Sequence, residues 1–293
     1  MNAARAALAA AILLMGIWAN LNPDVIDGWV DGGIASQSDE SAALVGLQTE
    51  EEWLVLRVQF PGKPFSQTKA DSMLGGDGSA TSYINQMSGS ESSLKITETT
   101  EIWTAPHAEG HWGADSTDER DIGVTNLIEE AAQALLTGTD LSRWDFDGDG
   151  TVDRILILHS GLAQESGGGA NAIWSHMSWL DEPLSIGDWS VSHYTIASLD
   201  SGIGTVIHEM LHQMGAHDLY DVHSDLPSSN WNGLGDWDIM ASGNWNGNGA
   251  APSMPGAATL DLIGAKRSIV VDTDIGGSFV VGPISDGGIS LAI

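Results

Sequence analysis

The stretch VIHEMLHQMGAHDLYD, from Val206 to Asp221, decides how the rest of the chain is interpreted. It contains the pattern HExxH, in which His208 and His212 are four residues apart and Glu209 follows His208. On a helix, residues four apart lie on one face, so both imidazoles can offer a nitrogen to one ion. Glu209 lies one position round the helix, where it can reach a water molecule on that ion. The stretch therefore predicts a helix that carries a metal site.

The pattern continues past the helix and offers two candidates for a third ligand. Gly215 permits the left-handed turn that ends a helix and aims the following residues back at the metal. Asp218 then completes HExxHxxGxxD, the elongated zinc pattern with Asp in place of the last His. Because no Glu follows Glu209, the third ligand is expected to be an Asp or a His, and His217 competes with Asp218. Either choice predicts a catalytic zinc ion with Glu209 as general base.

A methionine downstream fits the same type of site. The segment DWDIMASGNWNG places Met240 28 residues after His212. A methionine in a tight turn below the zinc is the second hallmark of peptidases with the extended motif, so we interpret Met240 as the residue of a Met turn. Together with the extended motif, it predicts a zinc hydrolase.

A second metal is predicted from the acidic loop DFDGDGTVD. Asp145, Asp147, Asp149 and Asp153 occupy positions 1, 3, 5 and 9 of this loop, and Gly150 occupies position 6. Alternating carboxylates around a glycine turn converge on a hard cation, which predicts a structural calcium ion. The twelfth position lacks the bidentate Glu of an EF-hand, so the loop is a shorter variant.

The composition restricts the partners. Asp and Glu number 40 against 10 Lys and Arg, which gives a formal net charge of -30. Such a chain repels phosphate backbones and anionic membranes, so nucleic-acid binding is not expected and the expected partners are protein or peptide substrates. Cysteine is absent, which excludes disulfides and thiolate ligands.

The order of segments predicts an exported, single catalytic domain. Arg5 precedes an apolar run that is short for a membrane span, so residues 1–19 are interpreted as a signal peptide and the protein as secreted, without stable membrane association once that peptide is cleaved. Residues 20–50 are interpreted as a linker or the remnant of a pro-segment and 51–266 as the catalytic domain. Residues 267–293 are interpreted as the start of a β-rich C-terminal segment, either complete or truncated.

Apolar periodicity predicts an α+β fold with α/β character. A twisted mixed sheet is expected, with a backing helix between residues 121 and 137, an active-site helix at 201–215, and then a loop-rich subdomain that contains the Met turn. Strands are expected at WLVLRVQF (53–60), SLKITETTEIW (93–103), RILILHSG (154–161), NAIWSHMSW (171–179), VSHYTIAS (191–198), SIVVDTD (268–274) and GSFVVGP (277–283), and a further short helix at TSYINQMSG (81–89).

The chain resembles the immune inhibitor A family of secreted metallopeptidases, which are metzincin-like zincins. The matching motifs are HEMLHQMGAHDLYD, DIMASGNWNG, DFDGDGTVDRILILHSG and IWSHMSW, and the resemblance extends over about residues 50–270. It implies a zincin fold and a zinc endopeptidase with His208, His212 and Asp218 as ligands and Glu209 as base. It favours Asp218 over His217 as the third ligand.

Two questions stay open at this point. Some metzincins place a Tyr after the Met turn to stabilise the oxyanion, but SGNWNG has none, which leaves Tyr220, His223 or backbone N–H groups for that role. The alternative function is a secreted, non-catalytic calcium-binding or adhesion module that retains the peptidase fold. The presence of Glu209 argues against it, since such a module has no need of the base.

Overall fold

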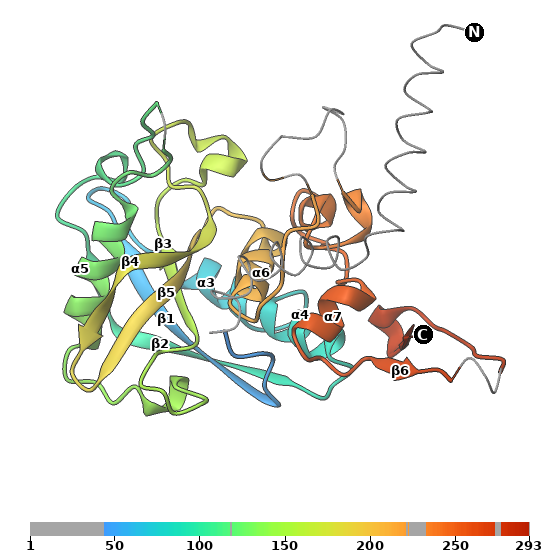
Figure 1. Ribbon diagram of the computed structural model, residues 1–293. Coiled ribbons are helices and arrows are strands. Elements are labelled where there is room, and N and C mark those ends of the chain that lie inside the picture. Colours follow the sequence, from blue (N-terminus) through green and yellow to red (C-terminus); the bar gives the residue numbers. More distant parts are fainter. Residues whose placement is uncertain (1–43, 118, 221, 223–232, 273–276, 293) are drawn as a thin grey trace, which may run out of the picture. The chain divides into compact units, whose positions relative to one another are not determined.

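The computed structural model describes residues 44–117, 119–220, 222, 233–272 and 277–292, and the elements are labelled in Figure 1. The predicted signal peptide and most of the segment 20–50 lie outside these residues. The chain divides into two units at Leu44, and every helix and strand of the described residues belongs to the unit Val45–Ile293. Within the described part of the chain, no helix has both the length and the apolar character to cross a membrane.

A five-stranded mixed sheet with the strand order β2-β1-β3-β5-β4 organises the domain. Its first four strands run parallel, and β4 is an antiparallel strand at one edge, next to β5. The strands are β1 (Glu50–Gln59), β2 (Ser93–Thr104), β3 (Ile155–His159), β4 (His176–Ile186) and β5 (Trp189–Ser198). The predicted mixed sheet is confirmed.

Helices cover both faces of the sheet, as Figure 1 shows. The helices are α3 (Gln67–Leu74), α4 (Ala80–Met87), α5 (Val124–Leu136), α6 (Ile203–His212) and α7 (Ala257–Leu262). Alternate residues of a strand point to opposite faces. Trp53 and Val55 of β1 therefore pack in one core with α3, α4, α6 and α7. Leu54 and Leu56 pack in a second core with α5. The active-site helix thus lies on one side of the sheet and the backing helix on the other.

The C-terminal part differs from the prediction at one strand. SIVVDTD contributes the short β6 (Ser268–Val270), which pairs with β7 (Ser290–Ala292). The predicted strand at GSFVVGP is wrong, because residues 277–283 form no strand and Val280 is 97% exposed. Strand propensity is effective only where a neighbouring strand and a buried face are available. The predicted strand at 171–179 begins only at His176.

A buried ion pair, which the sequence did not reveal, ties the acidic loop to the end of α6. Arg154 and Glu51 are both fully buried, and the guanidinium Nε donates to the Glu51 carboxylate. Nη1 of Arg154 also donates to the carbonyl of Gln213 at 2.9 Å, just after α6. Gln213 in turn donates through Nε2 to the Ile155 carbonyl in β3 at 2.7 Å. These bonds fix the C-terminal end of α6 against the sheet.

Removing Arg154 is expected to destabilise the protein strongly. Arg154→Met leaves the Glu51 carboxylate buried without its partner, so the free energy of unfolding should fall by about 3–5 kcal/mol in urea denaturation. The matched control is Lys95→Met, which removes an exposed ion pair with Glu52 and should cost less than about 1 kcal/mol. Equal losses in the two variants would contradict this assignment.

Candidate active site

Helix α6 carries the HExxH residues and ends where the sequence predicts. Residues 204–211 are all buried, so this helix is held in the core and not on the surface. After His212 the chain turns back through Gly215, whose φ of +95° lies in the left-handed region that favours glycine. The N–H of Ala216 donates to the carbonyl of Leu211 at 3.1 Å, which closes the turn. This turn directs the following residues back along the helix.

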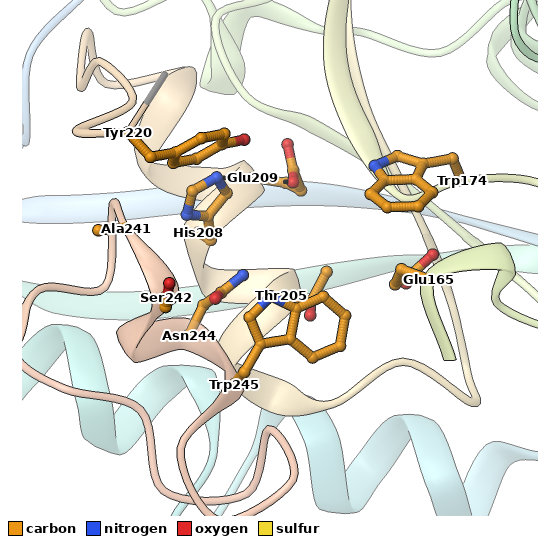
Figure 2. A pocket seen from close by; sticks show the side chains of 10 residues that line it. All are labelled: Glu165, Trp174, Thr205, His208, Glu209, Tyr220, Ala241, Ser242, Asn244 and Trp245. Carbon is orange, nitrogen blue, oxygen red and sulfur yellow. Dashed lines mark ion pairs between the residues drawn. The ribbon is translucent and has the colours of Figure 1, made fainter. Parts of the chain in front are cut away.

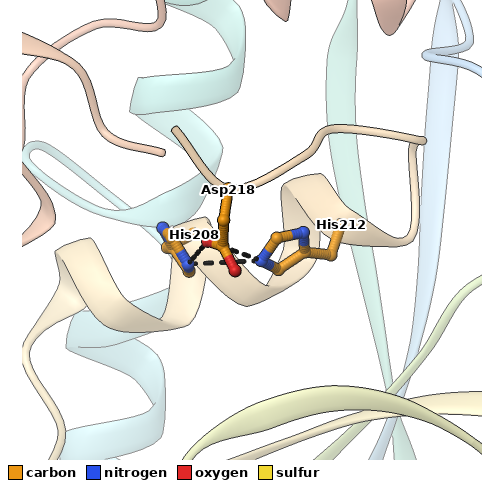
Figure 3. Close-up of side chains that lie close together, drawn as sticks. All are labelled: His208, His212 and Asp218. Carbon is orange, nitrogen blue, oxygen red and sulfur yellow. Dashed lines mark hydrogen bonds and ion pairs between the residues drawn. The ribbon is translucent and has the colours of Figure 1, made fainter. Parts of the chain in front are cut away.

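Three donor atoms meet at the point to which the turn leads. Nε2 of His208 lies 3.2 Å from Nε2 of His212. Oδ1 of Asp218 lies 3.1 Å from the first of these nitrogens and 3.4 Å from the second. Figure 3 shows the Asp218 carboxylate facing both rings from the returning chain. The structure therefore brings His208, His212 and Asp218 together as a group that could hold a metal ion. His217 is exposed and is not part of this group.

Backbone carbonyls fix the tautomers of both histidines. Nδ1 of His208 lies 2.8 Å from the carbonyl oxygen of Ile239, and Nδ1 of His212 lies 2.8 Å from that of Ala216. A carbonyl only accepts hydrogen bonds, so each Nδ1 must carry a hydrogen, and in the neutral imidazole each Nε2 then presents its lone pair. Two lone pairs and a carboxylate oxygen then face one another, and Oδ1 of Asp218 is buried without a hydrogen-bond donor among the described residues.

The pKa values of His208 and Asp218 are strongly shifted, because their side chains lie close together. Burial by itself lowers the pKa of His208, but the carboxylates of Asp218 and Glu209 outweigh it and raise this pKa to about 9. For Asp218, burial acts to raise the pKa, whereas His208 and His212 hold it well below its usual range. Both shifts mean that the group formed by His208, His212 and Asp218 favours a positive charge next to the Asp218 carboxylate.

Glu209 is placed beside this group by a contact with the sheet. Its Oε2 accepts a hydrogen bond from the N–H of Met177, in edge strand β4, at 2.9 Å, and its Oε1 lies 3.9 Å from Nε2 of His208. Burial raises the pKa of Glu209, and the neighbouring His208 and His212 act in the opposite direction. The side chain is only 10% exposed, so it is oriented and largely shielded from bulk water.

Met240 belongs to the hydrophobic core on the side of the sheet where α6 packs. It is fully buried and packs in the core that contains α6. Its neighbour Ile239 supplies the carbonyl that orients His208, and the carbonyl of Met240 accepts from the N–H of Leu219 at 2.7 Å, next to Asp218. The segment around Met240 therefore supports both the first histidine and the returning chain.

A pocket of about 230 Å³ opens next to Glu209 and His208. Figure 2 shows Trp174 and Trp245 among the side chains that line it, together with Glu165 and Tyr220. These residues come from four separate stretches of the chain. Tyr220 thus brings a hydroxyl to the pocket, as one of the candidates for stabilising the oxyanion, while His223 lies outside the described residues.

The acidic loop brings three of its four predicted ligands together. Carboxylate oxygens of Asp145, Asp147 and Asp149 lie within 4.8 Å of one another. Asp153 is not part of this group, because its Oδ2 turns inward and accepts from the N–H of Phe146 at 2.5 Å. Burial raises the pKa of Asp153 to about 6. Gly150, with φ of +87°, makes the turn that the loop requires.

The domain has the layout of a metallopeptidase catalytic domain: a mixed sheet, a buried helix with two histidines and a glutamate, and a carboxylate that returns to them. Residues 56–267 match the family model described as immune inhibitor A peptidase M6, catalytic domain. The chain belongs to this family, and the resemblance inferred from the motifs is confirmed.

The sequence identity of this chain to individual relatives is low. Immune inhibitor A of Bacillus thuringiensis subsp. alesti is 27% identical over 76% of this chain and 40% of that protein. The pre-pro-metalloprotease PrtV of Vibrio cholerae serotype O1 (strain M66-2) is 28% identical over 43% of this chain and 17% of that protein. The chain thus spans less than half the length of either relative. Metalloproteinase-II from Bacteroides fragilis aligns at 11% identity with a TM-score of 0.38, over 75% of this chain and 54% of that one.

Proposed function

We propose that the protein is a secreted, zinc-dependent endopeptidase with His208, His212 and Asp218 as the zinc ligands. The observation that carries this proposal is the meeting of two Nε2 lone pairs and one carboxylate oxygen within 3.4 Å. Two lone pairs and a carboxylate oxygen repel one another unless a proton or a metal cation lies among them. Two imidazoles and a carboxylate form a donor set that zinc accepts, and three protein ligands leave a position open for catalysis. When bound, zinc would polarise the peptide carbonyl and acidify a water molecule.

Glu209 is the general base in this proposal. Its carboxylate is held by the N–H of Met177, so one oxygen stays oriented towards the site. It takes the proton of the attacking water and later delivers a proton to the leaving amine. The carbonyl of Ile239 holds the ring of His208 in place. Tyr220 is our candidate for the hydroxyl that stabilises the oxyanion.

A polypeptide substrate suits the surroundings of the site. Strand β4 is at the edge of the sheet and contacts Glu209 through Met177. An edge strand has backbone N–H and C=O groups that can pair with an extended peptide. The bond to be cleaved would then lie along β4 and within reach of the base.

The direct test uses unfolded casein. The purified protein should cleave casein, lose this activity on treatment with a zinc chelator, and regain it when zinc is added back. Cleavage that survives complete removal of the metal would overturn the proposal. Tight zinc binding without cleavage of any polypeptide would instead favour the non-catalytic binding module.

We also propose that the acidic loop binds a structural calcium ion through Asp145, Asp147 and Asp149. Three carboxylates this close repel one another without a cation. Thr151 of the loop forms a bridge to Ser190 near the start of β5, so an ordered loop would support the beginning of that strand. Asp153 was predicted as a fourth ligand, and its inward contact with Phe146 leaves it a supporting role in this proposal.

Calcium is expected to raise the free energy of unfolding. At a calcium concentration 100 times its dissociation constant, the gain should be about 2.7 kcal/mol in thermal or urea denaturation. Asp147→Ala should abolish most of this gain. Asp77→Ala removes the same charge from an exposed loop and should leave the gain intact. A calcium effect of equal size in both variants would count against the site.

A further inference from the structure

The pocket beside Glu209 contains a second carboxylate that the proposed chemistry does not use. Glu165 belongs to the short helical turn Gln164–Gly168, far in sequence from α6. Figure 2 shows it on the side of the pocket opposite Tyr220, close to Trp174 and Trp245. A carboxylate at this place faces whatever side chain of a substrate enters the pocket.

The Glu165 carboxylate is held in a fixed orientation. Its Oε1 accepts from the hydroxyls of Ser175 at 2.7 Å and Ser201 at 2.8 Å, and its Oε2 accepts from the N–H of Ser175 at 3.1 Å. Both serines are buried. A carboxylate oxygen can accept two hydrogen bonds, and Oε2 receives one from the described residues. The carboxylate is therefore preorganised and retains capacity for one more donor.

The walls of the pocket suit a cation with a long apolar stem. Two indole rings, Trp174 and Trp245, line it, and the face of an indole attracts a positive charge. Thr205 and Asn244 also line it, and each has a buried oxygen without a hydrogen-bond partner among the described residues. A side chain that brings several N–H donors matches these acceptors better than an apolar or an acidic one.

Positive charge is scarce at the pocket itself. Among the described residues that line it, none is a Lys or an Arg. Arg120 is nearby, with its guanidinium 4.4 Å from the centroid of the Trp174 ring, but it is exposed and lines a separate cavity with Asp121. Solvent screens an exposed charge more than it screens an anchored carboxylate inside the pocket. The pocket therefore favours a cationic occupant.

We propose that Glu165 makes this pocket selective for a Lys or Arg side chain of the substrate, next to the bond that is cleaved. The ammonium or guanidinium group binds Oε2 of Glu165, and the stem of the side chain lies between the indoles of Trp174 and Trp245. This inference rests on the proposed endopeptidase function. It names Glu165 as a specificity-determining residue and basic polypeptides as the preferred substrate class.

Glu165 also joins its loop to Ser175 and Ser201, so a purely structural role has to be distinguished from selectivity. Glu165→Gln has nearly the same shape and keeps an oxygen that can accept from the serine hydroxyls. A ratio of kcat/KM values for two peptides in one mixture does not depend on the fraction of protein that is folded. The ratio therefore responds to selectivity and not to a general loss of structure.

The experiment uses a series of casein-derived peptides of one sequence, in which each position around the cleaved bond is in turn Lys, Arg, norleucine or Glu. The wild type should prefer Lys or Arg over norleucine at one position by about 10- to 100-fold in kcat/KM. Glu165→Gln should bring this ratio close to one, while Glu130→Gln, which removes an exposed charge on α5, should preserve it. Trp245→Leu should reduce the ratio to an intermediate value.

A binding arm separates the inference from the function on which it rests. Zinc-loaded Glu209→Gln protein is titrated with the same peptides by fluorescence anisotropy, with and without Glu165→Gln. Tighter binding of the Lys peptide that depends on Glu165, without any cleavage by the wild type, would support the selectivity and reject the endopeptidase. Cleavage without a basic preference, or a preference unchanged in Glu165→Gln, would overturn the selectivity alone.

Discussion

Glu209→Gln is expected to lower kcat/KM on casein-derived peptides by about 10²–10⁴-fold, the usual contribution of a general base. The amide keeps the size of the side chain and can still accept from the N–H of Met177, so the helix and the pocket should stay intact. It cannot take a proton from water at neutral pH. The loss should therefore appear in the chemical step, with the zinc content unchanged.

The control for this variant is Glu130→Gln, which removes an exposed carboxylate from α5. It should retain activity within about threefold of the wild type, because surface substitutions have small effects. Metal analysis of both proteins should give one zinc per chain. If Glu209→Gln kept more than a tenth of the wild-type activity, another residue would have to act as the base.

Local patterns in the sequence predicted the elements that depend on local properties. The alternation in WLVLRVQF and the apolar run RILILHSG became β1 and β3, and the spacing of HExxH with Gly215 became α6 and its turn. These features follow from periodicity and backbone conformation, which neighbouring residues determine. The placement of Asp218 next to the histidines follows from the same turn.

The supporting contacts could not be predicted, because they join distant parts of the chain. Arg154 and Glu51 are 103 residues apart, and nothing in RILILHSG distinguishes its arginine from a surface residue. Glu165 lies in a Gly-rich segment that resembles an ordinary loop, although it meets Ser175 and Ser201 in the core. Such partners become apparent only when the sheet order is known.

The side chains of the acidic loop differ in how far spacing alone predicts their direction. Positions 1, 3 and 5 alternate around a turn, so Asp145, Asp147 and Asp149 converge as the pattern indicates. Position 9 comes after the chain has started towards β3, and Asp153 is drawn to the N–H of Phe146. The adjacent strand, which a motif does not encode, determines the direction of this side chain.

Asp218→Ala is expected to weaken zinc binding by at least about 100-fold, because it removes one of the three donor atoms from the proposed site. The two histidines alone would keep weak affinity, so the purified variant should contain little zinc after dialysis against a mild chelator. Activity should fall in parallel with the metal. The measurement is the zinc content per chain, together with the dissociation constant from competition with a chromophoric chelator.

His217→Ala is the matched variant, since it removes a potential ligand from the adjacent position. His217 is exposed and lies outside the group formed by His208, His212 and Asp218, so its loss should change the zinc affinity by less than about threefold. Loss of zinc in His217→Ala with retention in Asp218→Ala would reverse the assignment of the third ligand. It would leave the pair of histidines on α6 in place, because their Nδ1 atoms are oriented by Ile239 and Ala216 independently of either residue.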